Sequence, residues 1–185
     1  MTGGRVVLVG GGVRSGKSRF AVDLALKRGE RRVFIATAQA FDDEMADRIA
    51  RHRVERAEAF ETVEAPTDLV AALRLRPHAE VVLIDCLTLW LSNLLLRGDT
   101  EADIAVEVGR LAEAVARRRS HVVIVTNEVG MGIVPESRLG RVFRDVAGRA
   151  HQRLAQEADE IYFAVLGAIV RLRPSADEVP PGSTP

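Results

Sequence analysis

Short apolar runs alternate along the chain with longer stretches in which apolar residues recur every three or four positions. The short runs predict strands near residues 5–10, 32–36, 80–85 and 121–126, and a shorter strand over Glu61–Glu64. The longer stretches predict helices over 17–28, 43–57, 67–75, 87–96, 101–118 and 136–158. Strands that alternate with helices in this way are typical of an α/β fold with a mainly parallel sheet.

Near its end the chain changes from this alternation to a hairpin. Glu160–Leu166 reads as a strand, Gly167 as a tight turn, and Ala168–Leu172 as an antiparallel returning strand. Residues 174–185 are rich in Pro, Ser and Gly and are expected to form a disordered tail. The remainder, 1–173, is then a single domain, which suits a chain of 185 residues.

Two helix starts carry sequence signals, and one helix is unusually apolar. Asp42 is expected to cap the helix that follows it, and Pro135 to open the last long helix, because the first helical residue tolerates a missing N–H. The apolar segment Leu87–Leu95 suits either a subunit interface or the core, and we favour the core.

A glycine-rich segment directly follows the first predicted strand and fits the pattern G-x-x-x-x-G-K-[ST]. Its residues are Gly11, Gly12, Val13, Arg14, Ser15, Gly16, Lys17 and Ser18. Glycines let the backbone fold around an anion, and the helix that follows adds its positive N-terminal end. We expect Lys17 to reach the β- and γ-phosphates and the Ser18 hydroxyl to complete the shell of Mg²⁺. The segment therefore predicts a nucleoside triphosphate site. With the mainly parallel sheet, the flanking helices and the antiparallel C-terminal strand, it predicts a P-loop NTPase-like (RecA-like) fold.

A carboxylate ends the apolar run Val81–Ile84, at Asp85. Ligands of open α/β sheets bind at the carboxyl edge, where this strand would end. An ordinary strand-ending Asp would be the plainer interpretation of these residues alone. Together with the phosphate loop, they favour a ligand of Mg²⁺, held directly or through water.

Among the four histidines, His52 has the most suggestive surroundings. It follows Met45 and Ile49 at helical spacing, with Arg48 and Arg56 one turn away on either side. From spacing alone a structural histidine is slightly favoured over a nucleophile, although nearby arginines would keep the imidazole neutral and nucleophilic. The others, His78, His121 and His151, read as structural or exposed and show no metal-ligand spacing.

The segment after the strand over 121–126 carries further polar residues. Glu128 suits a general base or a group that steers Mg²⁺-bound water, and it suits a surface acid equally well. Arg138, Arg141 and Arg144 share one helical face, where a solvated surface is the default interpretation and phosphate contact across a subunit boundary is the alternative.

The overall composition narrows the class of protein. Lys and Arg total 26, as do Asp and Glu, so the formal net charge is zero and the basic surplus of a general nucleic-acid binder is missing. Cys86 is the only cysteine, which fits a reducing cytoplasm. Met1 is followed so soon by a strand that we expect no signal peptide, and the longest apolar stretch, 81–95, is too short and polar to span a bilayer.

Several segments together resemble one known family. They are the phosphate loop with Arg19, Phe34–Ala38, Asp42–Met45, Arg48, Ile49, His52, Thr62–Glu64, Asp85–Thr88, Val125–Pro135, Arg144, Asp145, Gly148, Arg149 and Ala158–Glu160. In these segments the chain resembles the bifunctional adenosylcobinamide kinase/adenosylcobinamide-phosphate guanylyltransferases of cobalamin biosynthesis. The string T-N-E-V-G-x-G-I-V-P within Val125–Pro135 is the most specific part, and the resemblance extends to about Leu172.

This resemblance implies two reactions. A nucleoside triphosphate, ATP or GTP, first phosphorylates the terminal hydroxyl of the aminopropanol arm of adenosylcobinamide. GTP then guanylylates His52 with loss of pyrophosphate, and the substrate phosphate attacks the α-phosphorus to give adenosylcobinamide-GDP. The resemblance thus favours a nucleophilic His52 over a structural one. It also implies a homo-oligomer, a trimer.

The resemblance also implies which residues contact or surround the guanine nucleotide besides the phosphate loop. They are Ala36, Thr37, Ala38, Arg53, Val54, Glu55, Arg56, Glu64 and Asp85. The carboxylate of Glu64 can accept the N1–H and N2–H pair of guanine, which would favour GTP over ATP. The large corrinoid's docking residues do not follow from these motifs.

Three other functions are alternatives to this one. A phosphate-loop kinase for a small alcohol would use no guanylylated His52, and a nucleotide-sensing regulatory subunit would release no pyrophosphate in response to an acceptor. A RecA-like nucleic-acid module is disfavoured by the zero net charge and by the lack of interleaved aromatic and basic residues.

Overall fold

A computed structural model of the chain describes residues 3–39 and 59–174. The predicted helix over 43–57, its cap Asp42 and the predicted tail from residue 175 onward lie outside the described residues. The elements are β1 (Val6–Gly11), α1 (Lys17–Leu26), β2 (Arg32–Ala36), β3 (Glu61–Glu64), α3 (Leu69–Arg74), β4 (Val81–Asp85), α4 (Leu87–Arg97), α5 (Glu101–Ala116), β5 (His121–Val125), α6 (Arg138–Ala155), β6 (Glu160–Val165) and β7 (Ala168–Arg173).

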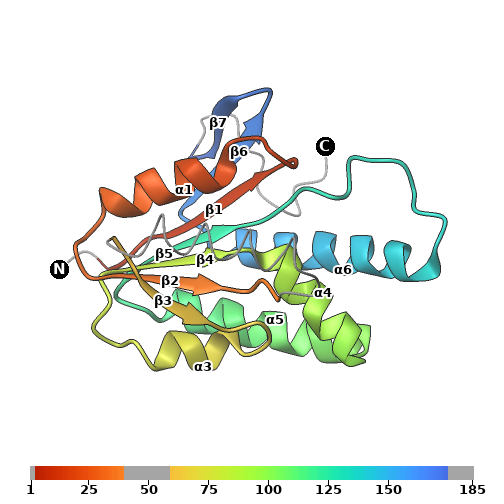
Figure 1. Cartoon of the computed structure of the whole chain (residues 1–185), viewed down its shortest axis with the longest axis horizontal. Coiled ribbons are helices and arrows are strands. Elements are labelled where there is room, and N and C mark those ends of the chain that lie inside the picture. The colour runs from red at the N-terminus through yellow and green to blue at the C-terminus, as the bar shows by residue number, and fades with distance from the viewer. Residues whose placement is uncertain (1–2, 40–58, 175–185) are drawn as a thin grey trace.

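The described strands form one seven-stranded sheet in the order β3-β2-β4-β5-β1-β6-β7. All neighbours are parallel except β6 and β7, which form an antiparallel hairpin. This hairpin rises at one edge of the sheet in Figure 1. The mainly parallel sheet with an antiparallel C-terminal strand confirms the predicted fold class, which is that of phosphate-loop NTPases and RecA-like proteins.

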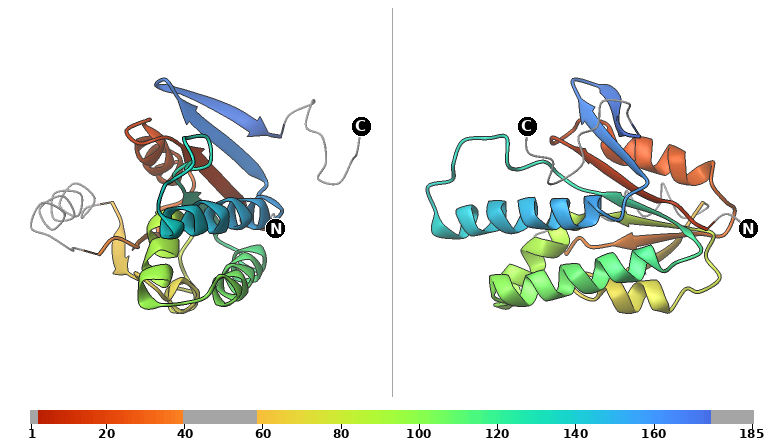
Figure 2. Two further views of the ribbon diagram at one scale, coloured as in Figure 1. Left: turned by 90° about the vertical axis from the view of Figure 1, so that its right-hand side faces the viewer. Right: turned by 180° about the vertical axis from the view of Figure 1, so that it is seen from behind.

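Helices cover both faces of the sheet, so its central strands are apolar on both sides. Alternate residues of β1 show the division: Val6 and Leu8 pack with α4, α5 and α6, whereas Val7 and Val9 pack with α1. Figure 2 shows α1 on one side of the sheet and the longer helices on the other. The runs of Val, Ile and Leu that predicted strands are therefore runs of buried residues.

The helices agree with the predicted ranges to within a few residues, and one predicted start is wrong. Pro135 precedes α6, which begins at Arg138 because the Ser137 hydroxyl accepts a hydrogen bond from the N–H of Gly140 at 3.1 Å. A side-chain cap two residues downstream thus sets the helix start. The predicted core location of the apolar segment Leu87–Leu95 is confirmed, since Trp90, Leu91 and Leu94 of α4 are fully buried.

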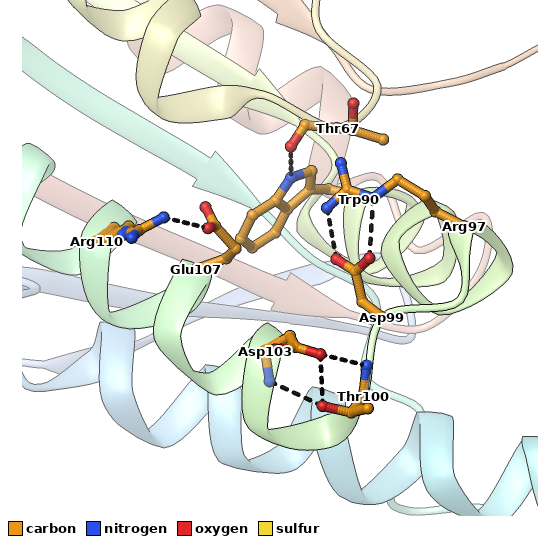
Figure 3. A network of polar contacts seen from close by, with 8 residues as sticks. All are labelled: Thr67, Trp90, Arg97, Asp99, Thr100, Asp103, Glu107 and Arg110. Carbon is orange, nitrogen blue, oxygen red and sulfur yellow. Dashed lines mark hydrogen bonds and ion pairs between the residues drawn. The ribbon is translucent and has the colours of Figure 1, made fainter.

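Polar contacts hold the junction between α4 and α5 (Figure 3). Gly98 ends α4 with φ 102°, a left-handed conformation that favours glycine. Asp99 then pairs with Arg97, and Thr100 and Asp103 form a reciprocal capping box at the start of α5. Trp90 anchors the same region by donating from its indole to the carbonyl of Thr67 at 2.7 Å.

No helix among the described residues is long and apolar enough to cross a bilayer.

We predict that Thr100→Ala lowers the Tm of the protein by about 2–4 °C, because α5 loses the hydroxyl that accepts the N–H of Asp103. Thermal unfolding followed by circular dichroism measures the change. Thr100→Ser keeps the hydroxyl and serves as the matched control, so an equal loss in both variants would contradict the capping role.

Candidate functional site

The strand order brings the predicted site residues to one edge of the sheet. β5 lies between β1, which leads into the phosphate loop, and β4, which ends at Asp85. In the register of the sheet Asp85 pairs with Val125, and Val125 pairs with Val9. Because these strands are parallel, their carboxyl ends open on the same side. The phosphate loop, Asp85 and the segment after β5 therefore share one edge.

The phosphate loop adopts the backbone conformations that its glycines allow. Gly11 and Gly16 have φ values of 154° and 91°, and Arg14, at 55°, is also left-handed. The Lys17 side chain is buried along the loop and its Nζ donates to the carbonyl of Gly12 at 3.0 Å. The lysine thus lies across the inside of the loop, and Val13 is 80% exposed at its tip.

Two helices that begin at this edge lack a side-chain cap. The N-caps of α1 and α4 are Gly16 and Cys86, neither of which accepts a capping hydrogen bond, and neither first turn carries an acidic residue. By contrast α3, α5 and α6 are capped by Asp68, Thr100 and Ser137. The helix ends at the site therefore keep backbone N–H groups and positive dipole ends that favour an anion.

The charges of Lys17 and Asp85 both act on Cys86, the first residue after β4. Burial raises the pKa of the Cys86 thiol, and the charge of Asp85 raises it further, while the charge of Lys17 lowers it. The buried thiol stays protonated and is a poor nucleophile. A cation from the phosphate loop and a carboxylate from β4 thus both lie near enough to Cys86 to act on its pKa.

The described residues suit a metal that arrives with phosphates. No group of three His, Cys, Asp or Glu side chains within 3–39 and 59–174 is arranged to hold a metal by itself. Mg²⁺ commonly takes one or two protein oxygens and completes its shell with phosphates and water. Ser18, exposed in the first turn of α1, and Asp85, half-buried at the end of β4, are oxygen donors of the required kind.

Ser15 adds a buried hydroxyl whose hydrogen-bonding capacity is unsatisfied by the described residues. Its Oγ is buried, and within the described part of the chain it makes no hydrogen bond. A buried hydroxyl in this condition is costly unless a bound group satisfies it. Its position inside the phosphate loop fits an anion as that group.

The predicted residues of β2 and β3 extend the same edge. Ala36 pairs with Glu64 on one side and with Asp85 on the other. Glu64 is exposed and lies about 19 Å from β1, since four steps of about 4.8 Å separate the strands. A nucleotide with its phosphates in the loop must run along the strand ends for its base to reach Glu64.

Thr37 holds the ends of β2 and β4 together. Its hydroxyl donates to the carbonyl of Cys86 at 2.8 Å and accepts from the Cys86 N–H at 2.7 Å. Its own carbonyl accepts from Asn93 Nδ2 at 2.8 Å. Thr37 is fully buried, so its side chain fixes the edge, while the neighbours Ala36 and Ala38 are partly exposed there.

The segment after β5 contains a histidine contact that the sequence reasoning missed. His151 of α6 reaches this segment, with Nε2 2.7 Å from the Thr126 hydroxyl and Nδ1 3.8 Å from Glu128 Oε2. Burial lowers the pKa of His151, and the charge of Glu128 opposes part of that shift. His151 read as structural or exposed because no metal-ligand spacing linked it to another residue.

Two of the three arginines on the predicted basic face of α6 hold the same segment. Arg144 donates to the carbonyl of Gly130 at 2.8 Å, and Arg141 donates to the carbonyls of Pro135 and Glu136. Neither is simply solvated, and their bonds fasten the connection between β5 and α6 to the helix. Phosphate contact by these arginines stays a prediction.

His52, Arg53, Val54, Glu55 and Arg56 lie outside the described residues. The site geometry is thus described for the phosphate loop, the ends of β2 to β5 and the segment after β5.

Comparisons with known proteins identify the family of the chain. The family model "Cobinamide kinase / cobinamide phosphate guanyltransferase" matches residues 7–172. The bifunctional adenosylcobalamin biosynthesis protein CobU of Escherichia coli strain K12 is 44% identical over 182 residues, covering 91% of this chain and 99% of that protein. The corresponding protein CobP of Pseudomonas aeruginosa is 42% identical over 167 residues, covering 90% and 96%.

Solved structures share the fold at low sequence identity. A protein from Pyrococcus horikoshii OT3 matches with a TM-score of 0.54 and 11% identity, covering 92% of this chain and 87% of that one. The flagellar accessory protein FlaH from Methanocaldococcus jannaschii matches with a TM-score of 0.51 and 11% identity, covering 91% and 76%. At this identity the likeness concerns the fold alone.

We predict that Gly11→Ala lowers the free energy of unfolding by about 1–3 kcal/mol. The backbone φ of 154° at position 11 is unsuited to alanine, and a Cβ there would lie 2.6 Å from the carbonyl oxygen of Ala164. Gly12→Ala is the matched control, since a Cβ there meets nothing within 4 Å. Urea unfolding measures both variants. Equal stability of the two would show that β1 and β6 do not require glycine at position 11.

Proposed function

The chain belongs to the cobinamide kinase / cobinamide phosphate guanyltransferase family and is a bifunctional transferase of cobalamin biosynthesis, and we propose that both reactions take place at the sheet edge that carries the phosphate loop and Asp85, with His52 as the nucleophile of the second. The match of the family model over residues 7–172 is the observation that carries the function. GTP and ATP are its nucleotide substrates. The acceptor of the kinase reaction is adenosylcobinamide, and the acceptor of the guanylyltransferase reaction is adenosylcobinamide phosphate.

In the kinase reaction the phosphate loop positions the triphosphate. Phosphoryl transfer depends mainly on alignment and charge neutralisation, and covalent chemistry by the protein is not needed. Lys17 and the uncapped start of α1 supply positive charge, and Ser15 supplies an unsatisfied hydroxyl. Ser18 and Asp85 would hold Mg²⁺, which supplies charge neutralisation between the phosphates when it is bound.

In the guanylyltransferase reaction His52 would act as the nucleophile. A neutral imidazole attacks the α-phosphorus of GTP and pyrophosphate leaves; the phosphate of the acceptor then displaces the imidazole. Ala36, Thr37, Ala38, Glu64 and Asp85 lie along strand ends that adjoin one another, which supports a shared nucleotide surface. Arg53, Val54, Glu55 and Arg56 complete the proposed set.

The resemblance described above adds an assembly and a location to this proposal. We infer a homo-oligomer, a trimer, acting on small molecules in the cytoplasm, with nucleic acid absent from its ligands. Size-exclusion chromatography with light scattering would test the trimer.

We predict that His52→Ala abolishes covalent labelling by α-labelled GTP with Mg²⁺, since no imidazole remains to accept the guanylyl group. The measurement is the label that the protein retains after denaturation. In the wild type, the bond between the guanylyl group and His52 should be acid-labile and base-stable. His78→Ala is the matched control, because His78 is an exposed histidine on the chain segment before β4. Undiminished label on the His52 variant would place the guanylyl group elsewhere, and a wild type that binds GTP without labelling would leave a plain kinase.

We predict that Asp85→Asn raises the Mg²⁺ concentration for half-maximal kinase activity by about tenfold or more, because a neutral amide is a weaker Mg²⁺ ligand than a carboxylate. Initial rates across a Mg²⁺ titration measure the effect. Asp23→Asn makes the same change of charge at an exposed position of α1 and should leave the titration unchanged. Superimposable curves for wild type and the Asp85 variant would remove Asp85 from the metal site.

A further inference from the structure

Glu128 lies where the chain leaves β5 and passes the phosphate loop. Its backbone N–H donates to the carbonyl of Gly11 at 3.0 Å, so it is fastened to the first residue of that loop. Because β5 lies between β1 and β4, the segment that leaves it is placed between the phosphate loop and the end of β4. A carboxylate here is beside the place where transferred phosphate and acceptor must meet.

The carboxylate of Glu128 is held through one oxygen, and its side chain remains partly exposed. Its Oε1 accepts the N–H of Gly130 at 2.5 Å, and Arg144 fixes Gly130 from α6 through its carbonyl. A Cβ at position 130 would lie 2.8 Å from Oε1, so glycine leaves room for the carboxylate to fold back. The Glu128 side chain is still 28% exposed, so it is not sealed off from a substrate.

His151 faces the second oxygen of this carboxylate. Since burial lowers its pKa, its imidazole is neutral at neutral pH. A carboxylate attracts an N–H and repels a lone pair, so Nδ1, which lies 3.8 Å from Oε2, carries the hydrogen. Nε2 then accepts from the Thr126 hydroxyl at 2.7 Å. The 3.8 Å separation is too long for a direct hydrogen bond. His151 therefore orients the Glu128 carboxylate through the electrostatic attraction of its N–H or through a bridging water.

From this geometry we propose that Glu128 is the general base of the kinase reaction and that His151 is its positioning residue. The acceptor hydroxyl oxygen forms a bond to the γ-phosphorus while the bond from that phosphorus to the β,γ-bridging oxygen breaks. The hydroxyl proton passes to Oε2 of Glu128, the nucleoside diphosphate leaves, and Glu128 returns the proton to water. This inference rests on the proposed kinase reaction.

The two reactions of the protein differ in their need for such a base. An alcohol must lose its proton as it attacks, so a placed carboxylate accelerates the kinase step. Guanylylation of His52 needs no proton removed from an acceptor alcohol, and the phosphate that accepts the guanylyl group is largely deprotonated already at neutral pH. Loss of the base should therefore separate the two activities.

The test uses the full-length protein carrying Glu128→Gln, which keeps an oxygen for the Gly130 N–H and removes the charge. With adenosylcobinamide and nucleoside triphosphate, we expect the kinase kcat to fall by about 10²–10⁴-fold while KM for the acceptor changes less than about threefold. Labelling of His52 by α-labelled GTP should stay within about threefold of wild type. Glu136→Gln, an exposed acid of the same connection, is the matched control and should alter neither activity.

Three results would overturn the role of Glu128. An equal loss of both activities would mean that the residue supports the phosphate loop or the fold. No loss of kinase activity would mean that no base is needed at this position. Recovery of the kinase rate by excess Mg²⁺ would mean that Glu128 serves the metal. A wild type that lacks kinase activity would contradict the proposed function itself, which keeps the two failures distinct.

A double-mutant cycle tests His151 separately. If His151 acts through Glu128, His151→Ala lowers the kinase kcat by about tenfold in the wild-type background and has no effect in the Glu128→Gln background. Labelling of His52 monitors the fold in each variant. Equal losses in both backgrounds would show that His151 acts independently of Glu128.

Discussion

The placement of β5 between β1 and β4 is the constraint on which the rest of the site depends. Parallel strands end at a common edge. This order therefore places the phosphate loop, the carboxylate of Asp85 and the polar connection after β5 side by side, although they are far apart in the sequence. The charges of Lys17 and Asp85 both act on the pKa of Cys86, which reflects this placement. Helix ends without side-chain caps at the same edge add to its attraction for anions.

The buried strands explain why polar groups concentrate at that edge. With helices on both faces, positions within β1, β4 and β5 are apolar, and a polar residue is tolerated only where a strand ends. Thr37 and Thr126 follow this rule: both are buried just beyond strand ends, and both have hydrogen-bond partners there. The bonds of Thr37 join the ends of β2 and β4, and the bond of Thr126 joins the end of β5 to His151 of α6.

The sequence predicted the fold well because its signals were local. Uninterrupted Val, Ile and Leu runs mark strands buried on both faces, and the glycine pattern of the phosphate loop is readable from eight consecutive residues. The start of α6 was wrong because Pro135 looked like a first helical residue, whereas Ser137 supplies the cap. His151 was missed because its partner Thr126 lies 25 residues earlier, and only the packing of α6 beside β5 brings them together. His52 could be selected as the nucleophile only from the family resemblance, because its helical spacing alone slightly favours a structural histidine.

The most direct test of the shared edge is a crystal structure of the protein with Mg²⁺ and a GTP analogue whose β,γ-bridge cannot be cleaved. We predict that the phosphates lie against the loop from Gly11 to Ser18, with Asp85 on the metal side and the guanine toward Glu64. Triphosphate density away from that loop, or a base bound at the opposite edge of the sheet near His78, would contradict it.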